Sequence, residues 1–123
     1  MPRILVADDD PNQLRLRKCL LEAGGYAVST ALGAAETMQQ VSVADLVIMD
    51  LCFPNASGKA DAEEGLALIR RIRQSGFRAP VIVLSGWPEE LFGKPEEAMV
   101  SRVFTKPVSM ALLLESIGQL LVA

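Results

Sequence analysis

The sequence predicts an α/β fold in which a doubly wound parallel sheet of five strands forms one domain over residues 1–123. Short, almost wholly apolar runs alternate along the chain with longer segments in which apolar residues have helical spacing. Such runs are typical of strands that helices cover on both faces, and the alternation indicates parallel strands joined by helical crossovers. The length agrees with one domain, because a domain usually takes roughly 100–200 residues.

The first strand is expected at residues 3–7 and the first helix at residues 11–23. Asp10 followed by Pro11 is a typical helix start, because aspartate caps the first turn and proline fits the first helical position. The apolar residues of this helix form two arcs, one with Leu16, Cys19, Leu20 and Ala23 and the other with Leu14 and Leu21. Apolar residues on two sides predict packing against both the sheet and a neighbouring helix.

The remaining elements continue the alternation. Strands are expected at 26–31, 45–49, 80–84 and 102–105, and helices at 34–41, at 65–75 and from a cap at Ser109 to residue 121. Residues 51–64 are rich in turn-forming residues and are expected to form a long connection. A helix over residues 88–100 should be split into two short pieces, because Gly93 and Pro95 interrupt it.

The composition excludes several classes of chemistry. The chain has 15 acidic and 12 basic residues, a formal net charge of −3, two cysteines and no histidine. Without histidine it cannot carry a Ser-His-Asp triad, a histidine base or a histidine zinc site, and two cysteines are too few for a Cys₄ zinc site or a disulfide framework. The acidic balance argues against nonspecific binding to nucleic acid. One group of arginines is interpreted as a solvated helix face: Arg70, Arg71, Arg73 and Arg78.

The same sequence favours a cytoplasmic location. No signal peptide is recognisable, and no uncharged apolar run approaches the roughly 20 residues that a membrane-spanning helix needs. Cys19 and Cys52 are expected to be reduced thiols that are buried as small hydrophobic side chains. We therefore expect no membrane insertion.

Polar residues follow the predicted strands at their carboxyl ends. They are Asp8, Asp9, Asp50, Ser85 and Lys106. The carboxyl ends of parallel strands meet at one edge of the sheet, where ligands bind in folds of this class. Three carboxylates at such an edge repel one another unless a cation joins them, and oxygen ligands select Mg²⁺ or a similar hard ion. A carboxylate flanked by a metal ion and a lysine can accept a phosphoryl group as a nucleophile.

Taken together, these motifs resemble the receiver domain of two-component response regulators over essentially the whole chain. The segments that carry the resemblance are ILVADDD at 4–10, LVIMD at 46–50, Pro54 with Gly58, VIVLSG at 81–86 and FTKP at 104–107. The resemblance implies a flavodoxin-like (βα)₅ fold. It also implies a signalling domain that catalyses at most its own phosphorylation and dephosphorylation.

The resemblance implies roles for individual residues. Asp50 would be the phosphoacceptor, Asp9 would bind Mg²⁺ directly, Asp8 would bind it mainly through water, and the backbone carbonyl of Cys52 would complete the protein ligands. The phosphoryl group would come from a histidine kinase or a histidine phosphotransfer protein, and the output would go to an effector protein or domain. Direct binding to nucleic acid by this domain is not expected.

Two further roles follow from the last motifs. Ser85 would be the switch hydroxyl, and Lys106 would pair with the acyl phosphate. The Lys106-Pro107 peptide bond is expected to be cis on the same resemblance.

Several features depart from the family pattern. Residues 59–64 resemble an insertion beside the phosphorylation site, and Val103 stands where the family has its switch aromatic. Phe104 follows one position later, so the strand period should point it to the opposite face of the sheet. In the receiver family that this chain resembles, the position of Trp87 influences access of water to the phosphoryl group, and the bulk of Trp87 therefore predicts slow autodephosphorylation.

Three other functions compete with this interpretation. A degenerate receiver, acting only as a binding module, has Val103 as its main support, but it is disfavoured because all the residues of the phosphorylation site are present. A haloacid-dehalogenase-type phosphatase also uses an aspartate nucleophile, but Asn12 replaces the hydroxyl residue of that family's motif and the chain has no room for a cap domain. A nucleotide-binding domain is disfavoured, because the turn after the first strand is acidic and lacks the glycines of a dinucleotide loop.

Overall fold

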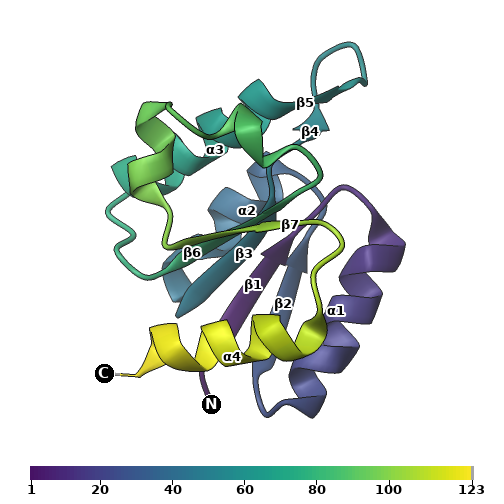
Figure 1. Cartoon of the computed structure of the whole chain (residues 1–123), viewed down its shortest axis with the longest axis vertical. Coiled ribbons are helices and arrows are strands. Elements are labelled where there is room, and N and C mark those ends of the chain that lie inside the picture. The colour runs from purple at the N-terminus through teal and green to yellow at the C-terminus, as the bar shows by residue number, and fades with distance from the viewer. Residues whose placement is uncertain (123) are drawn as a thin grey trace.

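The computed structural model describes residues 1–122, and its centre is a parallel sheet of five strands in the order β2-β1-β3-β6-β7 (Figure 1). The strands are β1 (Arg3–Ala7), β2 (Ala27–Ala31), β3 (Leu46–Asp50), β6 (Val81–Ser85) and β7 (Arg102–Thr105). The topological switch point of the sheet lies between β1 and β3. The chain first proceeds from β1 outward to β2, and it then crosses to β3 on the other side of β1. The doubly wound parallel sheet predicted from the sequence is confirmed.

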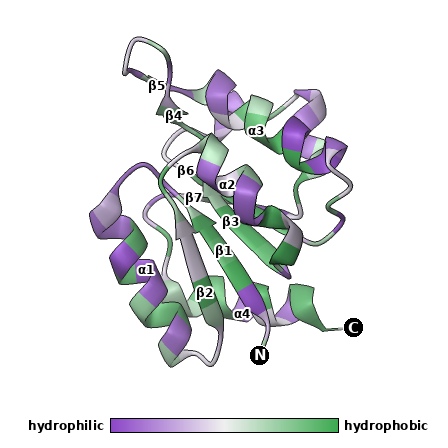
Figure 2. Cartoon of the chain, turned by 180° about the vertical axis from the view of Figure 1, so that it is seen from behind, coloured by the Kyte–Doolittle hydropathy of each residue, from purple (hydrophilic) through white to green (hydrophobic). Residues whose placement is uncertain are grey.

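Helices cover both faces of the sheet, with α2 and α3 on one side and α1 and α4 on the other (Figures 1 and 2). Their bounds are α1 (Pro11–Ala23), α2 (Ala34–Gln40), α3 (Ala62–Gln74) and α4 (Met110–Leu121), with short 3₁₀ helices η1 (Val41–Val43), η2 (Pro88–Glu90) and η3 (Pro95–Met99). The predicted caps form as expected: the Asp10 side chain accepts the N–H of Asn12, and Ser109 accepts that of Leu112. Among the residues described, no helix is long and apolar enough to cross a membrane.

Alternate residues of each strand build two separate cores. In β1, for example, Leu5 packs with the core under α2 and α3, whereas Ile4 and Val6 pack with the core over α1 and α4. The same alternation in β7 places Val103 against the first core and Phe104 against the second. The prediction that Phe104 points away from the face of Val103 is therefore confirmed.

Helix α1 corrects one expectation. Leu14, Arg17 and Leu21 are its buried residues, whereas Leu16 is 54% exposed and Cys19 is also exposed. The predicted packing of both apolar arcs is wrong, because α1 contacts the sheet on one side and solvent covers the other. Burial of Cys19 is wrong for the same reason.

Residues 51–64 are more regular than predicted. Strands β4 (Phe53–Pro54) and β5 (Ala60–Asp61) pair as an antiparallel hairpin that projects from the sheet edge (Figure 1). The last three residues of the expected connection form the first turn of α3, because the Asp61 side chain caps that helix by accepting the N–H of Glu63. The apparent insertion is therefore a hairpin arm together with the first turn of a helix.

One close approach holds α3 against the end of β3. A Cβ atom on Gly65 would lie 1.7 Å from the carbonyl oxygen of Leu51, the residue that follows β3. Only glycine permits this packing, which positions the chain immediately after Asp50.

The segment after β6 is split into two 3₁₀ helices, as Gly93 and Pro95 predict. Arginines of α3 tie it to the rest of the domain: Arg70 lies 2.8 Å from Glu96, and Arg73 donates to the Met99 carbonyl at 2.9 Å. These two arginines thus make tertiary contacts, so the interpretation of the whole group as a solvated face is wrong for them.

Candidate functional site

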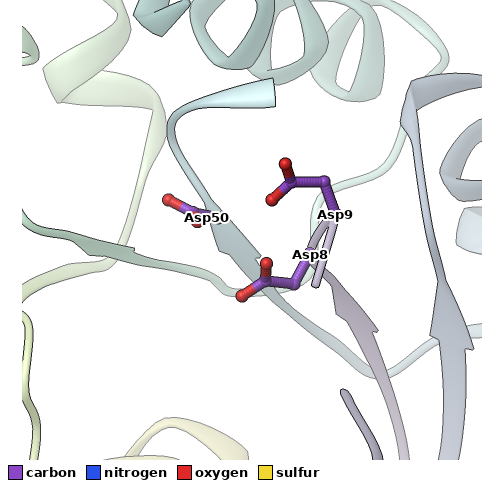
Figure 3. A group of neighbouring side chains, drawn as sticks. All are labelled: Asp8, Asp9 and Asp50. Atoms are coloured by element: carbon purple, nitrogen blue, oxygen red, sulfur yellow. The ribbon is translucent and has the colours of Figure 1, made fainter. Parts of the chain in front are cut away.

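Three aspartates converge at the carboxyl edge of the sheet. Asp8 and Asp9 directly follow β1, and Asp50 is the last residue of the neighbouring strand β3 (Figure 3). Carboxylate oxygens of the three side chains lie within 4.8 Å of one another. Asp8 is 1% exposed and Asp50 is 9% exposed, whereas Asp9 faces solvent. The structure brings together the acidic group that the strand-end argument predicted.

Lys106 joins this group from the end of β7. Its Nζ atom lies 2.8 Å from Oδ2 of Asp50 and 3.7 Å from Oδ2 of Asp8. Its backbone N–H donates to the Ser85 carbonyl at 2.8 Å, and the Lys106-Pro107 peptide is cis, as predicted. The lysine is thus anchored through its main chain while its ammonium neutralises the carboxylates.

Ser85 ends β6 and is fully buried. Its Oγ accepts the backbone N–H of Trp87 at 3.0 Å. The pairing of Asp50 with Leu84 in the sheet places Ser85 one position beyond Asp50 on the adjacent strand. The hydroxyl therefore lies at the correct edge, but its hydrogen bond is to the backbone after β6 rather than to Asp50.

Cys52 contacts the site through its backbone. Its N–H donates to Oδ1 of Asp50 at 3.3 Å. Burial, followed by the negative charge of Asp50, raises the pKa of its thiol, so the side chain stays protonated near neutral pH. A protonated thiol is a poor nucleophile, which agrees with the sequence-based preference for carboxylate chemistry.

Arg17 is the site residue that the sequence analysis missed. It extends from α1 to place Nη1 2.7 Å from Oδ2 of Asp8, and the two side chains are only 9% and 2% exposed. The sequence did contain an indication that Arg17 is buried. The spacing of Leu14, Arg17 and Leu21 places the arginine on the same helix face as two core leucines.

The surroundings shift the pKa values of the first two aspartates in opposite directions. Burial alone raises the pKa of Asp8, but hydrogen bonds from Arg17 and the Asp10 N–H, with the charges of Lys106 and Arg17, outweigh it and leave the pKa below its usual value. The pKa of Asp9 is raised by the partial desolvation of its carboxyl group, by a side-chain hydrogen bond with Asp8 and by repulsion from the charge of Asp8. The positive charges nearest to the site pair with the other two carboxylates, because Arg17 lies 2.7 Å from Asp8 and Lys106 lies 2.8 Å from Asp50.

The donor set fits a hard divalent cation. The three aspartates supply only oxygen ligands, and the two nearby cations, Lys106 and Arg17, leave one negative charge uncompensated when all three carboxylates are ionised. Carboxylate oxygens at such a spacing suit Mg²⁺, which is usually bound through one or two carboxylates with water completing the shell.

Comparison with known proteins identifies the class. A family model described as the response regulator receiver domain matches residues 4–118, and the chain belongs to this family. It is a receiver domain of two-component signalling, as the sequence resemblance indicated.

Among curated relatives, the chain is 34% identical to the sensory/regulatory protein RpfC of Xanthomonas campestris pv. campestris over 98% of its own length and 17% of that protein. It is 33% identical to the virulence transcriptional regulatory protein PhoP of Salmonella typhimurium over 74% of its length and 40% of that protein. The chain therefore spans less than half of the length of these curated relatives.

Among solved structures, the response regulator TrrA of Thermotoga maritima in complex with Mg²⁺-BeF is 28% identical, with a TM-score of 0.83 over 98% of this chain and 100% of that one. TrrA in complex with the histidine kinase ThkA matches with a TM-score of 0.82 and 28% identity, over 99% of this chain and 100% of that one. The likeness extends over the whole sheet and its helices.

Proposed function

We propose that the domain accepts a phosphoryl group on Asp50 from a histidine kinase or a histidine phosphotransfer protein, in a reaction that requires Mg²⁺. The observation that carries the proposal is the Lys106 ammonium, 2.8 Å from Oδ2 of Asp50, with oxygens of Asp8 and Asp9 within 4.8 Å of that carboxylate group. The complexes of TrrA with Mg²⁺-BeF and with ThkA support both the metal and the class of donor.

In the proposed step, a carboxylate oxygen of Asp50 attacks the phosphorus atom of a phosphohistidine. A phosphorus–oxygen bond forms, the phosphorus–nitrogen bond breaks, and the imidazole leaves with a proton from solvent. Lys106 is placed to neutralise charge on the transferred oxygens, and the Cys52 N–H holds the other oxygen of Asp50 in position. Asp8 and Asp9, together with Asp50 and the Cys52 carbonyl, would hold Mg²⁺, which supplies further charge neutralisation when bound.

Ser85 is proposed as the switch hydroxyl. Its Oγ accepts the Trp87 N–H, so its own proton remains available for a phosphoryl oxygen at the same edge of the sheet. Movement of the segment after β6 would then follow phosphorylation. With Val103 in place of an aromatic, this segment rather than a rotating ring would carry the change to a partner.

The wider setting is proposed on the same basis. Residues 1–123 form a single receiver domain that acts in the cytoplasm, signals to an effector protein or effector domain, and does not itself bind nucleic acid. The domain is a stoichiometric phosphoacceptor whose catalysis is limited to its own phosphorylation and dephosphorylation. The complete acidic site and its lysine favour this function over the degenerate receiver.

Incubation with Mg²⁺ and phosphoramidate, followed by intact-mass measurement, tests the proposal. We expect one added HPO₃ unit in the wild type and in the control Glu115→Ala, which changes an exposed acid on α4, and none in Asp50→Ala. An unmodified wild type would overturn the proposal in favour of the degenerate receiver. Repeated turnover of a phosphate ester would instead indicate a phosphatase.

A further inference from the structure

We propose that Arg17 is a positioning residue that acts through Asp8: it supplies a built-in positive charge that organises the acidic site without a metal and thereby weakens its affinity for Mg²⁺. The inference rests on the proposed metal site. It concerns a residue in the middle of α1, whereas the three aspartates lie at the ends of strands β1 and β3.

The burial of Arg17 is the first observation. Its side chain is 9% exposed and lies on the helix face that Leu14 and Leu21 bury against the sheet. A buried guanidinium loses hydration, so it is tolerated only with a charged partner and good geometry. The partner is Asp8, whose side chain is 2% exposed, at 2.7 Å.

The second observation concerns how Asp8 is held. Its Oδ1 accepts the N–H of Asp10 at 3.0 Å, and its Oδ2 accepts Nη1 of Arg17. Both oxygens are thus hydrogen-bonded before any cation arrives. A cation that approaches Asp8 directly has to share or displace the Arg17 contact, whereas a metal-bound water can be accepted without breaking it.

The third observation is the charge balance. Lys106 is committed to Asp50 at 2.8 Å and is farther from Asp8, at 3.7 Å. Arg17 is therefore the principal neutralising group for Asp8. With it, the three carboxylates coexist in the metal-free protein; without its charge, they repel one another more strongly and attract a divalent cation more strongly.

The variant Arg17→Gln removes the positive charge but keeps a polar side chain with hydrogen-bond donors, although that side chain is shorter than arginine. We expect it to bind Mg²⁺ about tenfold more tightly than the wild type and to have a lower melting temperature without metal. The added stability on saturation with Mg²⁺ should also be larger than in the wild type. Arg17→Lys, which retains the charge, should remain within about threefold of the wild-type dissociation constant for Mg²⁺.

Arg15→Gln is the matched control. This arginine lies on the same helix, is exposed, and pairs with the Asn12 side chain rather than with the acidic site, so the same loss of charge should leave Mg²⁺ binding unchanged. Isothermal titration calorimetry with MgCl₂ and thermal unfolding with and without the metal give both quantities.

A purely structural role for Arg17 predicts a different result: a lower melting temperature with an unchanged or weaker Mg²⁺ affinity in folded Arg17→Gln. That result, with Asp50 still phosphorylated in the wild type, would overturn this inference and leave the proposed function intact. If Arg17→Gln does not fold, Arg17→Lys decides the matter, because a folded lysine variant with strongly altered affinity contradicts the charge argument. A wild type that does not bind Mg²⁺ would overturn both proposals.

Discussion

The ammonium of Lys106 lies 2.8 Å from Oδ2 of Asp50, although 56 positions separate the two residues along the chain. The contact crosses the sheet edge, because Asp50 ends β3, Lys106 follows β7, and β6 lies between those strands. The main-chain hydrogen bond from the Lys106 N–H to the Ser85 carbonyl fixes the position of Lys106 relative to the carboxyl end of β6. Asp50 and Lys106 therefore come together because the parallel pairing of β3, β6 and β7 aligns the carboxyl ends of these strands.

Replacement of Lys106 tests this contact. Lys106→Met keeps an unbranched side chain of nearly the same length but removes the charge, and we expect the rate of Asp50 phosphorylation by phosphoramidate to fall at least about tenfold. The measurement is the time course of HPO₃ addition by mass spectrometry. Lys59→Met, on the exposed turn of the hairpin, serves as the control and should react at the wild-type rate. Equal rates for both variants would remove Lys106 from the reaction.

The close packing of α3 predicts a severe effect at Gly65. A Cβ there meets the Leu51 carbonyl at 1.7 Å, so Gly65→Ala forces the helix or the end of β3 to move. We expect a loss of about 2–4 kcal/mol in the free energy of unfolding, measured by urea denaturation. Gly118→Ala, in α4 with open space around the new methyl group, should instead stabilise the domain by about 0.5–1 kcal/mol. Similar effects at both glycines would contradict the packing argument.

The Arg70–Glu96 pair predicts a pH dependence of stability. The hydrogen bond from Arg70 holds the pKa of Glu96 below its ordinary value of 4.5, so the folded state favours the ionised carboxylate. The contribution is fully present above that ordinary value and is lost as the pH falls through the lowered pKa of the folded state.

Wild type and Glu96→Gln should therefore differ most in unfolding free energy near neutral pH, with the variant less stable, and should converge in acid. Urea denaturation over a pH series measures this difference. Glu89→Gln, an exposed neighbour on η2, should follow the wild-type profile. A constant gap between wild type and Glu96→Gln at every pH would argue that the carboxylate charge is irrelevant.

Trp87 predicts a long-lived acyl phosphate. Its backbone N–H donates to Ser85 Oγ at 3.0 Å, which holds this residue close to the end of β6, and Trp87 is 63% exposed. We expect Trp87→Ala to shorten the lifetime of phosphorylated Asp50 several-fold by admitting water. The decay of the HPO₃ adduct after removal of the donor gives the lifetime, and Phe92→Ala, another exposed aromatic substitution, is the control. An unchanged lifetime in Trp87→Ala would exclude a shielding role.

Much of this domain was predictable because its signals are local. Apolar runs located the five strands of the sheet, the caps Asp10 and Ser109 located the starts of two helices, and Gly93 with Pro95 indicated the broken helix. The residues of the acidic site were predictable as well, because parallel strands bring their carboxyl ends to a common edge whatever the details of packing.

The start of α3 was harder to predict from the sequence. It begins at Ala62 because Asp61 caps it and because the hairpin of β4 and β5 returns the chain to that point. The two-residue strands of this hairpin are too short to produce a periodic pattern in the sequence. Their pairing is a tertiary outcome.

The burial of Arg17 against Asp8 is the feature of the site that could not be predicted from the sequence. The amino-acid sequence determined the sheet, the order of its strands along the chain and the aspartates and lysine at their ends. It also placed apolar residues on two arcs of α1, either of which could have faced the sheet. Only the tertiary structure decided that the face with Leu14 and Leu21 is buried, and with it Arg17 against Asp8. The physical reason is that burial of a charge depends on a partner from another element, and no local pattern states which partner will be within reach.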